Sequence, residues 1–278
     1  MLLSVFQAKE LLNAFDNNRK EAVVSLDLGI STSKIIIEQE SFIFPDNQRL
    51  ALTQIRKIIK KDTSCYLINK NDLQKIALFS PETNYYYKLV PTGARTPPTL
   101  EISGIRMHVT KSMSPKEDTE MKIGFVSPCN GAILDTCTGL GYTAILAAKT
   151  ADEVYTFEKD INIIEIQKLN PWSEELFSNK KIKRFHGDIF QRIKKLDTGK
   201  FARVIHDPPR YALAPELYSN EFYDQLYRVI TKKGILYHYT GEPGRKKGAD
   251  IKVGVIKKLT YAGFIEIKRV FNGLVALK

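Results

Sequence analysis

Four acidic residues in the second half of the chain stand where strand-like segments end. They are Asp135, Glu158, Asp188 and Asp207. Helical patterns separate the four segments, and this alternation predicts a parallel sheet, in which ligands bind beyond the carboxyl ends of the strands. Carboxylates gathered at one edge repel one another, so we expect a ligand that supplies hydrogen-bond donors or positive charge.

The last of the four acids belongs to HDPPRY, residues 206–211. Pro208 and Pro209 donate no backbone hydrogen bond and hold a stiff extended turn. With Asp207, this turn forms a rigid edge that is rich in hydrogen-bond acceptors. A rigid turn with only a structural role is the alternative.

The loop after the first strand reads DTCTGLGYT, residues 135–143. Gly139 and Gly141 let the backbone approach a ligand closely, although a single GxG pattern also fits a tight packing turn. Cys137 stands where a dinucleotide loop has its first glycine, and this departure favours a ligand without a pyrophosphate.

The next two acids suit a nucleoside. Glu158 ends the second strand and can accept both hydroxyls of a ribose, which disfavours NADP because a 2′-phosphate needs a basic residue there. Asp188 can accept from an adenine amino group, with Ile189 beside the ring. The same aspartate can instead cap the helix that begins after it.

The elements that position these residues alternate from residue 130 onward. Strands are expected at 131–137, 153–160, 181–188, 201–207 and 234–240, and helices at 142–151, 161–169, 220–233 and 248–263. Asn272-Gly273 lies between two β-rich runs and predicts a closing hairpin. Residues 116–278 should therefore form a Rossmann-like, doubly wound α/β domain with a mostly parallel sheet and an antiparallel last strand.

Residues 1–115 predict a small α+β domain, which we interpret as a domain that presents the substrate. Its segment LDLGISTSK, residues 26–34, resembles the first phosphate loop of actin-like and sugar kinases. That fold needs a longer chain and further phosphate motifs, so we expect a strand, a turn and a strand there.

DTCTGLGYT, FEKD, GDIF and DPPR resemble, in this order, the successive motifs of class I S-adenosylmethionine-dependent methyltransferases over about residues 120–278. Within that family, TLEISGIRMH and FYDQLYRVITKKG are similar to segments of an archaeal-type group of predicted RNA (amino-)methyltransferases, and also of spermidine-synthase-like enzymes. The resemblance implies S-adenosyl-L-methionine as cofactor. The residues that it assigns to cofactor binding are Asp135, Thr136, Cys137, Gly139, Gly141, Tyr142, Thr143, Glu158, Lys159, Asp188 and Ile189.

In amino-methyltransferases of this kind, the acid and the first proline carbonyl of the DPP motif accept the two hydrogens of an exocyclic amine. The resemblance therefore implies a catalytic set of Asp207, Pro208, Pro209 and Arg210. Arg210 stands where an aromatic ring is expected; its guanidinium can stack on a base, or Tyr211 supplies the ring one residue later. We expect methylation of a base amine, with cytidine N4 favoured over guanosine or adenosine.

The charge of the chain favours a polyanionic partner. The formal net charge is +11; residues 1–120 hold 16 Lys and Arg against 14 Asp and Glu, whereas residues 121–278 hold 26 against 17. Neutralisation of phosphates dominates nucleic-acid affinity, so we expect RNA, ribosomal or transfer, although a lysine-rich solvated surface is also common. The predicted substrate-binding residues are Tyr211, Arg95, Arg106, Arg245, Lys246 and Lys247, and KKIKRF, residues 180–185, is a further basic cluster.

Two other functions remain open: an aminopropyltransferase or small-molecule methyltransferase that uses the same cofactor site, and an RNA-binding protein without activity. A polyamine needs extra carboxylates near Asp207, where Arg210 stands instead. Three scattered cysteines and four scattered histidines predict neither a disulfide framework nor a metal site. With no apolar run of membrane-spanning length and no signal peptide, we expect a cytoplasmic protein; its oligomeric state is not predicted.

Overall fold

The computed structural model of the chain describes residues 1–61, 63–241 and 251–278. Two compact units are present: Met1–Asp118 with Glu165–Trp172, and Thr119–Ile164 with Ser173–Lys278. The sequence placed a domain boundary between residues 115 and 116. Among the described residues, no helix is long and apolar enough to cross a membrane.

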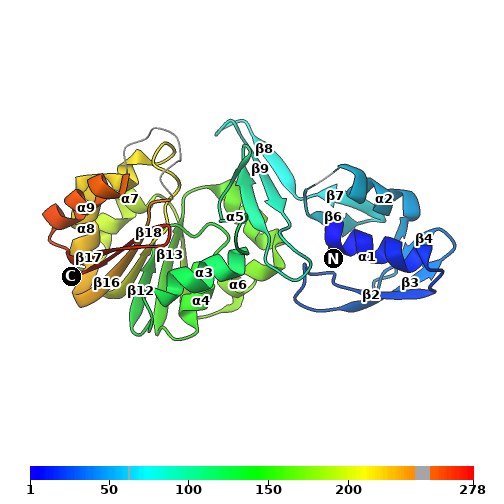
Figure 1. Cartoon of the computed structure of the whole chain (residues 1–278), viewed down its shortest axis with the longest axis horizontal. Coiled ribbons are helices and arrows are strands. Elements are labelled where there is room, and N and C mark those ends of the chain that lie inside the picture. The colour runs from blue at the N-terminus through cyan, green and yellow to red at the C-terminus, as the bar shows by residue number, and fades with distance from the viewer. Residues whose placement is uncertain (62, 242–250) are drawn as a thin grey trace. The chain divides into compact units, whose positions relative to one another are not determined.

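The second unit is built on a seven-stranded sheet with the order β14-β13-β12-β15-β16-β18-β17 (Figure 1). The bounds are β12 (Ala132–Asp135), β13 (Glu153–Glu158), β14 (Ile182–His186), β15 (Phe201–His206), β16 (Ile230–Tyr239), β17 (Ile265–Val270) and β18 (Gly273–Leu277). The first five strands in this order are parallel, and β18 inserts antiparallel between β16 and β17. The predicted fold class, including the antiparallel last strand, is confirmed.

Helices cover both faces of this sheet (Figure 1). They are α3 (Pro115–Gly124), α4 (Tyr142–Ala148), α6 (Glu175–Ser178), α7 (Ile189–Arg192), α8 (Asn220–Val229) and α9 (Ile251–Ala262), with 3-10 turns at Ile193–Lys195 and Pro215–Tyr218. Helix α5 (Ile161–Leu169) begins in the second unit and continues into the first, and a 3-10 turn at Pro171–Ser173 leads back to the second unit. Apolar side chains of α7, α8 and α9 form the core on one face, and those of α3, α4 and α6 form a second core.

The helix predicted at 220–233 is too long. Helix α8 ends at Val229, and Ile230 already has extended backbone and begins β16. Ile230 is fully buried and pairs with Phe201 of β15. Sheet pairing and burial therefore override the helical pattern of the last four residues, because a tertiary context outweighs intrinsic propensity.

The first unit contains two helices and three antiparallel sheets. The helices are α1 (Val5–Asp16) and α2 (Leu52–Lys61). The sheets are β1 (Leu2–Leu3), β6 (Tyr66–Asn69) and β7 (Asp72–Lys75); β2 (Glu21–Val24), β3 (Ser33–Glu38), β4 (Ser41–Ile43) and β5 (Arg49–Ala51); and β8 (Ala77–Ser80), β9 (Tyr85–Val90), β10 (Thr99–Ile102) and β11 (Ile105–Arg106).

The kinase-like segment LDLGISTSK connects β2 to β3, which pair antiparallel. The strand, turn and strand expected from the sequence are therefore present. The Asp27 carboxylate is engaged within its own loop, where it accepts hydrogen bonds from the Ser31 hydroxyl, the Ser25 hydroxyl and the backbone N–H groups of Ile30 and Ser31. Partial burial raises the pKa of Asp27, but the bonds from Ser31, with those from Ser25 and Ile30, outweigh it and lower the pKa.

Candidate active site

Asp135 is fully buried at the end of β12. Its oxygens accept hydrogen bonds from the hydroxyls of Thr143, at 3.2 Å, and Thr156, at 2.6 Å. Burial is the main cause that raises the pKa of Asp135 to about 7, and the carboxylates of Asp207 and Glu158 add to it. Because both oxygens take hydroxyl donors, Asp135 holds the start of α4 and the neighbouring strand β13 in place.

Glu158 ends β13 and is tied to the glycine loop. One carboxylate oxygen accepts from the Gly139 N–H at 2.9 Å, and the other accepts from the Asp160 N–H at 2.9 Å. Burial raises the pKa of Glu158 to about 7 despite these bonds. Within the described residues neither Glu158 nor Asp135 forms an ion pair, so a cationic or donor-rich ligand would stabilise both carboxylates.

The two glycines of the loop have different roles. At Gly141, with φ of +83°, an added Cβ would lie 2.2 Å from a methyl carbon of Leu176, so this position needs glycine for packing. At Gly139, with φ of +52°, an added Cβ would meet no atom within 4 Å. Gly139 therefore borders open space that a ligand can enter, whereas Gly141 matches the packing-turn interpretation.

Cys137 and Tyr142 flank these glycines. Burial raises the pKa of the Cys137 thiol well above its usual range, with smaller contributions from nearby carboxylates. The thiol therefore stays protonated and is a poor nucleophile. Tyr142 opens α4 as a buried residue.

Asp188 follows β14 and caps α7. One oxygen accepts from the Phe190 N–H at 2.9 Å, and the other lies 2.8 Å from the Lys159 ammonium. The hydrogen bond to Asp188 raises the pKa of Lys159, and Ile189 is buried beside them. The helix-cap alternative is thus present in the structure, and the contact of Asp188 with an adenine stays a prediction.

Asp207 directly follows β15 and is anchored by a buried lysine. Its Oδ2 lies 2.7 Å from the Nζ of Lys122, a residue of α3 whose side chain is only 3% exposed. The same ammonium lies 5.2 Å from the centre of the Tyr239 ring. Oδ1 of Asp207 accepts no hydrogen bond from the described part of the chain, so one oxygen is fixed and the other is open.

The two prolines also differ. Tyr218 donates its hydroxyl to the Pro209 carbonyl at 2.9 Å, and burial, aided by the charge of Asp207, raises the pKa of Tyr218 so that it remains a donor. No described residue donates to the Pro208 carbonyl. Oδ1 of Asp207 and the Pro208 carbonyl, on adjacent residues, are therefore the acceptors of the motif without a donor among the described residues, and Pro208 itself is buried.

Arg210 and Tyr211 are both exposed. Tyr211 is 50% exposed and packs edge-on against Tyr218, with ring centres 5.5 Å apart. A partly exposed ring therefore lies directly after the DPPR turn, where the sequence allowed either Arg210 or Tyr211 to stack on a base.

Two buried histidines support this turn from the inside. Nε2 of His206 lies 3.0 Å from the Leu217 carbonyl. Because a carbonyl can only accept a hydrogen bond, Nε2 carries the ring hydrogen. Nδ1 therefore accepts a hydrogen bond from the Thr136 hydroxyl, at 2.8 Å. Burial lowers the pKa of His206 to about 3, and the His238 ring lies 4.4 Å away, centre to centre. Neutral imidazoles in this position brace the turn and are unsuited to act as general bases at neutral pH.

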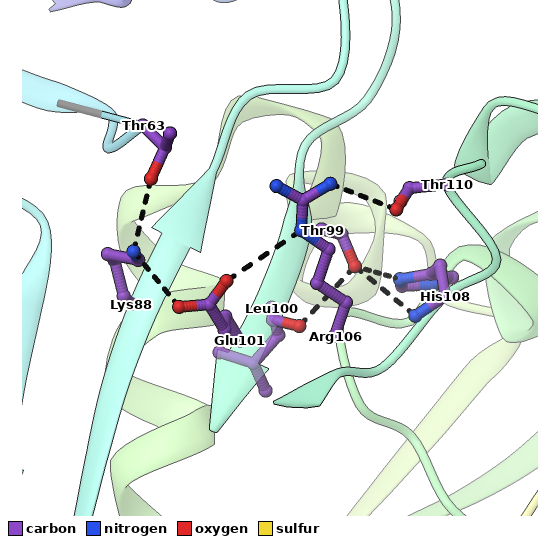
Figure 2. A network of polar contacts seen from close by, with 8 residues as sticks. All are labelled: Thr63, Lys88, Thr99, Leu100, Glu101, Arg106, His108 and Thr110. Carbon is purple, nitrogen blue, oxygen red and sulfur yellow. Dashed lines mark hydrogen bonds and ion pairs between the residues drawn. The ribbon is translucent and has the colours of Figure 1, made fainter. Parts of the chain in front are cut away.

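Some predicted substrate residues lie in the first unit. Figure 2 shows Arg106 of β11 turned toward Glu101, with Nε 3.7 Å from the carboxylate, and Glu101 also pairs with Lys88 at 2.9 Å. Arg106 donates to Thr110 as well, so this arginine is part of a structural network. Arg95 is exposed in the loop before β10.

Three further predictions concern residues 245–247. Arg245, Lys246 and Lys247 lie outside the described residues, and their contribution to substrate binding stays a prediction. Within the described part, no group of histidine, cysteine and acidic side chains is arranged to hold a metal ion.

Sequence reasoning missed Lys122, Thr156 and Tyr218. Nothing marks Lys122 among 42 basic residues, because its role depends on the packing of α3 beside β15. Thr156 did carry a signal: it is a hydroxyl residue inside the apolar strand EVYTFE, where an unpaired hydroxyl is costly and needs a partner.

The arrangement of strands and helices has known counterparts. A structure of spermidine synthase in complex with the transition-state analogue AdoDATO shares the fold with a TM-score of 0.58 and 15% identity, over 73% of this chain and 72% of that one. A structure of a SAM-dependent methyltransferase from Archaeoglobus fulgidus matches 59% of this chain and 92% of that one, with 14% identity and a TM-score of 0.43. No protein-family model matches the chain.

The fold is thus the doubly wound α/β fold that the spermidine synthase also has. At the level of sequence, the chain is 44% identical to the uncharacterized protein MJ1233 of Methanocaldococcus jannaschii over 279 residues, which cover 98% of this chain and 93% of that protein. The chain belongs to the same family as MJ1233.

Proposed function

We propose that the protein is an S-adenosylmethionine-dependent methyltransferase that methylates an exocyclic amine of a base in RNA. The observation that carries the proposal is the pair of acceptors without donors at Asp207 and Pro208. Near Asp207, the carboxylates of Asp135 and Glu158 have no cationic partner among the described residues. S-adenosylmethionine would supply an electrophilic methyl group on a positively charged sulfur.

The residues present fit this cofactor. Asp135 and Glu158 have pKa values raised to about 7 by burial, so a ligand with positive charge and hydroxyl donors favours their ionised forms. Glu158 would receive ribose hydroxyls, and the open space at Gly139 leaves room for the backbone to approach the ligand.

The DPPR turn would position the amine. The lone pair of an aryl amine is delocalised into the ring, which makes it a weak nucleophile. Oδ1 of Asp207 and the Pro208 carbonyl would accept its two hydrogens and stabilise the positive charge that forms on nitrogen as the new N–C bond is made. As that bond forms, the bond between the methyl group and sulfur would break, its electron pair would go to sulfur, and a neutral thioether would leave. Lys122 fixes the other oxygen of Asp207, so the acceptor does not move during the reaction. The proton then leaves the nitrogen to solvent.

Lys122 also bears on the alternative substrates. An aminopropyltransferase would bind a cationic polyamine, for which Asp207 is the natural counter-charge. Here the ammonium of Lys122 already occupies one oxygen at 2.7 Å. A second ammonium would be repelled by the like charge of Lys122, whereas the neutral amine of a base would not. Among the bases, we favour cytidine over guanosine and adenosine.

The test compares nucleosides of ribosomal and transfer RNA from strains with and without the gene, followed by methyl transfer with purified protein. We expect one methylated base to disappear in the deletion strain and to be restored in vitro. Asp207→Ala should abolish transfer and leave S-adenosylmethionine binding nearly unchanged, whereas Asp197→Ala, at an exposed acid, should behave like the parent. Unchanged RNA modification, or aminopropyl transfer to putrescine, would contradict the proposal.

A further inference from the structure

A shallow cleft of about 390 Å³ lies where α6 meets β14, the edge strand of the seven-stranded sheet. Its size falls in the lower part of the range of ligand pockets, roughly 300–1,000 Å³. The lining contains three cationic side chains and two half-exposed rings. These are Lys180, Lys183, Arg184, Phe177 and Phe185.

The three cations lack acidic partners. Among residues 1–61, 63–241 and 251–278, no carboxylate pairs with any of them. Other lysines of the same unit do pair with acids, namely Lys159, Lys194 and Lys200. Uncompensated charges gathered in a concave surface attract anions more strongly than the same charges spread out.

Lys181 provides a contrast within the same basic run. Its ammonium donates to the carbonyls of Ala148 and Ala151, at the end of α4. Lysine at the C-terminus of a helix satisfies carbonyls that have no intrahelical partner. Lys183 also donates to a carbonyl, that of Lys180 at 3.1 Å, but this bond is exposed and lies within the basic run itself. Lys181 is therefore the structural lysine of KKIKRF, and the cleft takes its charge from Lys180, Lys183 and Arg184.

Aromatic contacts hold the cleft in shape. The Arg184 guanidinium stacks over Phe177, with its central carbon 4.1 Å from the ring centre. This contact orients the planar group without neutralising its charge, as an acid would. Phe185 stacks on Phe157 at 4.8 Å and keeps 39% of its surface exposed.

We propose that this cleft binds a single strand of RNA, with its cations on the phosphates and a base against the exposed rings. Cationic grooves with aromatic platforms are the way proteins bind single strands. Naming RNA rests on the function proposed above. From β14 the chain passes through Gly187 to Asp188 at the carboxyl end of the sheet, so a strand held along this edge leads toward the predicted cofactor site.

The test measures the binding of a short, fluorescein-labelled single-stranded RNA by anisotropy over a series of salt concentrations. The double variant Lys183→Ala/Arg184→Ala should bind about tenfold more weakly at low salt, and its salt slope should fall by about 1.4, the value for two lost phosphate contacts on a single strand. The matched control Lys232→Ala/Lys257→Ala removes two exposed lysines and should stay close to the parent.

Arg184→Lys keeps the charge and loses the planar stack, so we expect a smaller loss. Equal losses of RNA affinity in the two double variants would overturn the proposal. It would also be overturned if inorganic polyphosphate of equal charge displaced the RNA as well as unlabelled RNA does. If the Lys183→Ala/Arg184→Ala variant kept its RNA affinity but began to self-associate, these cations would only protect the sheet edge from pairing with another chain. That result would also overturn the proposal.

The proposal that the cleft binds RNA and the proposal that the protein is a methyltransferase can be refuted independently. Calorimetry with S-adenosylmethionine should give the same affinity for the cleft variant and the parent. A parent that methylates RNA while the cleft variant binds RNA normally would refute the cleft alone. A parent that binds RNA through the cleft without binding S-adenosylmethionine would support the cleft and refute the methyltransferase.

Discussion

Two partly buried acids, one in each unit, have opposite surroundings. Glu101 in the first unit is 17% exposed and lies between Lys88 and Arg106, on neighbouring strands (Figure 2). Glu158 in the second unit accepts only backbone N–H groups, and burial raises its pKa to about 7. The chain supplies two cations to one carboxylate and none of its described residues supplies a cation to the other.

We interpret this difference as one between a structural carboxylate and a candidate ligand-binding carboxylate. When an acid is paired with cations, their attraction offsets the free-energy cost of removing the carboxylate from water. An acid without a cation is destabilised until a ligand arrives, and such perturbed groups cluster at functional sites. Four predictions test this distinction.

The largest effect is expected at Glu158. Replacing it with glutamine removes the charge and weakens the contact with ribose hydroxyls, so S-adenosylmethionine should bind about 100-fold more weakly, or by about 2.7 kcal/mol. Isothermal calorimetry measures this. Glu101→Gln is the matched control and should leave the affinity unchanged. An equal loss of S-adenosylmethionine affinity in the Glu158→Gln and Glu101→Gln variants would mean that the absence of a cationic partner does not mark a ligand site.

The next effect is the pH dependence of cofactor affinity. The ligand favours the ionised form of a group whose pKa is about 7 without it, so affinity should fall about tenfold between pH 8 and pH 6, one unit below that pKa. Calorimetry at both values checks this. Glu158→Gln should flatten the profile, and a profile as steep as the parent's would assign the titration to another group.

Stability without ligand should change in the opposite direction. A carboxyl whose pKa is raised in the folded state is stabilised in its protonated form, so this contribution is fully present below the unfolded pKa near 4 and is lost as pH rises through 7. Both Asp135 and Glu158 act in this sense. Thermal melts should show that added S-adenosylmethionine stabilises the protein more at pH 8 than at pH 6. A ligand-induced shift independent of pH would contradict this linkage.

The smallest effect is expected at Glu101. Glu101→Gln leaves Lys88 and Arg106 without their counter-charge, but Lys88 keeps its hydrogen bond to Thr63 and Arg106 its bond to Thr110. We expect a loss of about 1 kcal/mol in unfolding free energy, measured by urea denaturation. No loss would show that this network does not contribute to stability.

Much of the second unit could be predicted because its signals are local. Strand periods, helix periods and the Asn272-Gly273 turn depend on neighbours in sequence, and they gave the correct order of the strands and of helices α4, α5, α8 and α9, whereas the short helix α6 was not predicted. The boundary between α8 and β16 was wrong, since the pairing of Ile230 with Phe201 joins segments that are distant in sequence. The four acids at the strand ends were visible for the same local reason.

The sequence by itself determined the doubly wound fold, the acids at the carboxyl edge of the sheet and the rigid DPPR turn. Only the tertiary structure decided which partners these groups have. Lys122 meets Asp207 across 85 residues, Gly141 packs against Leu176 while Gly139 faces open space, and Asp188 is engaged as a helix cap. Residue type sets the chemistry that a side chain can perform, but burial and long-range packing set its charge, its partners and its access to a ligand.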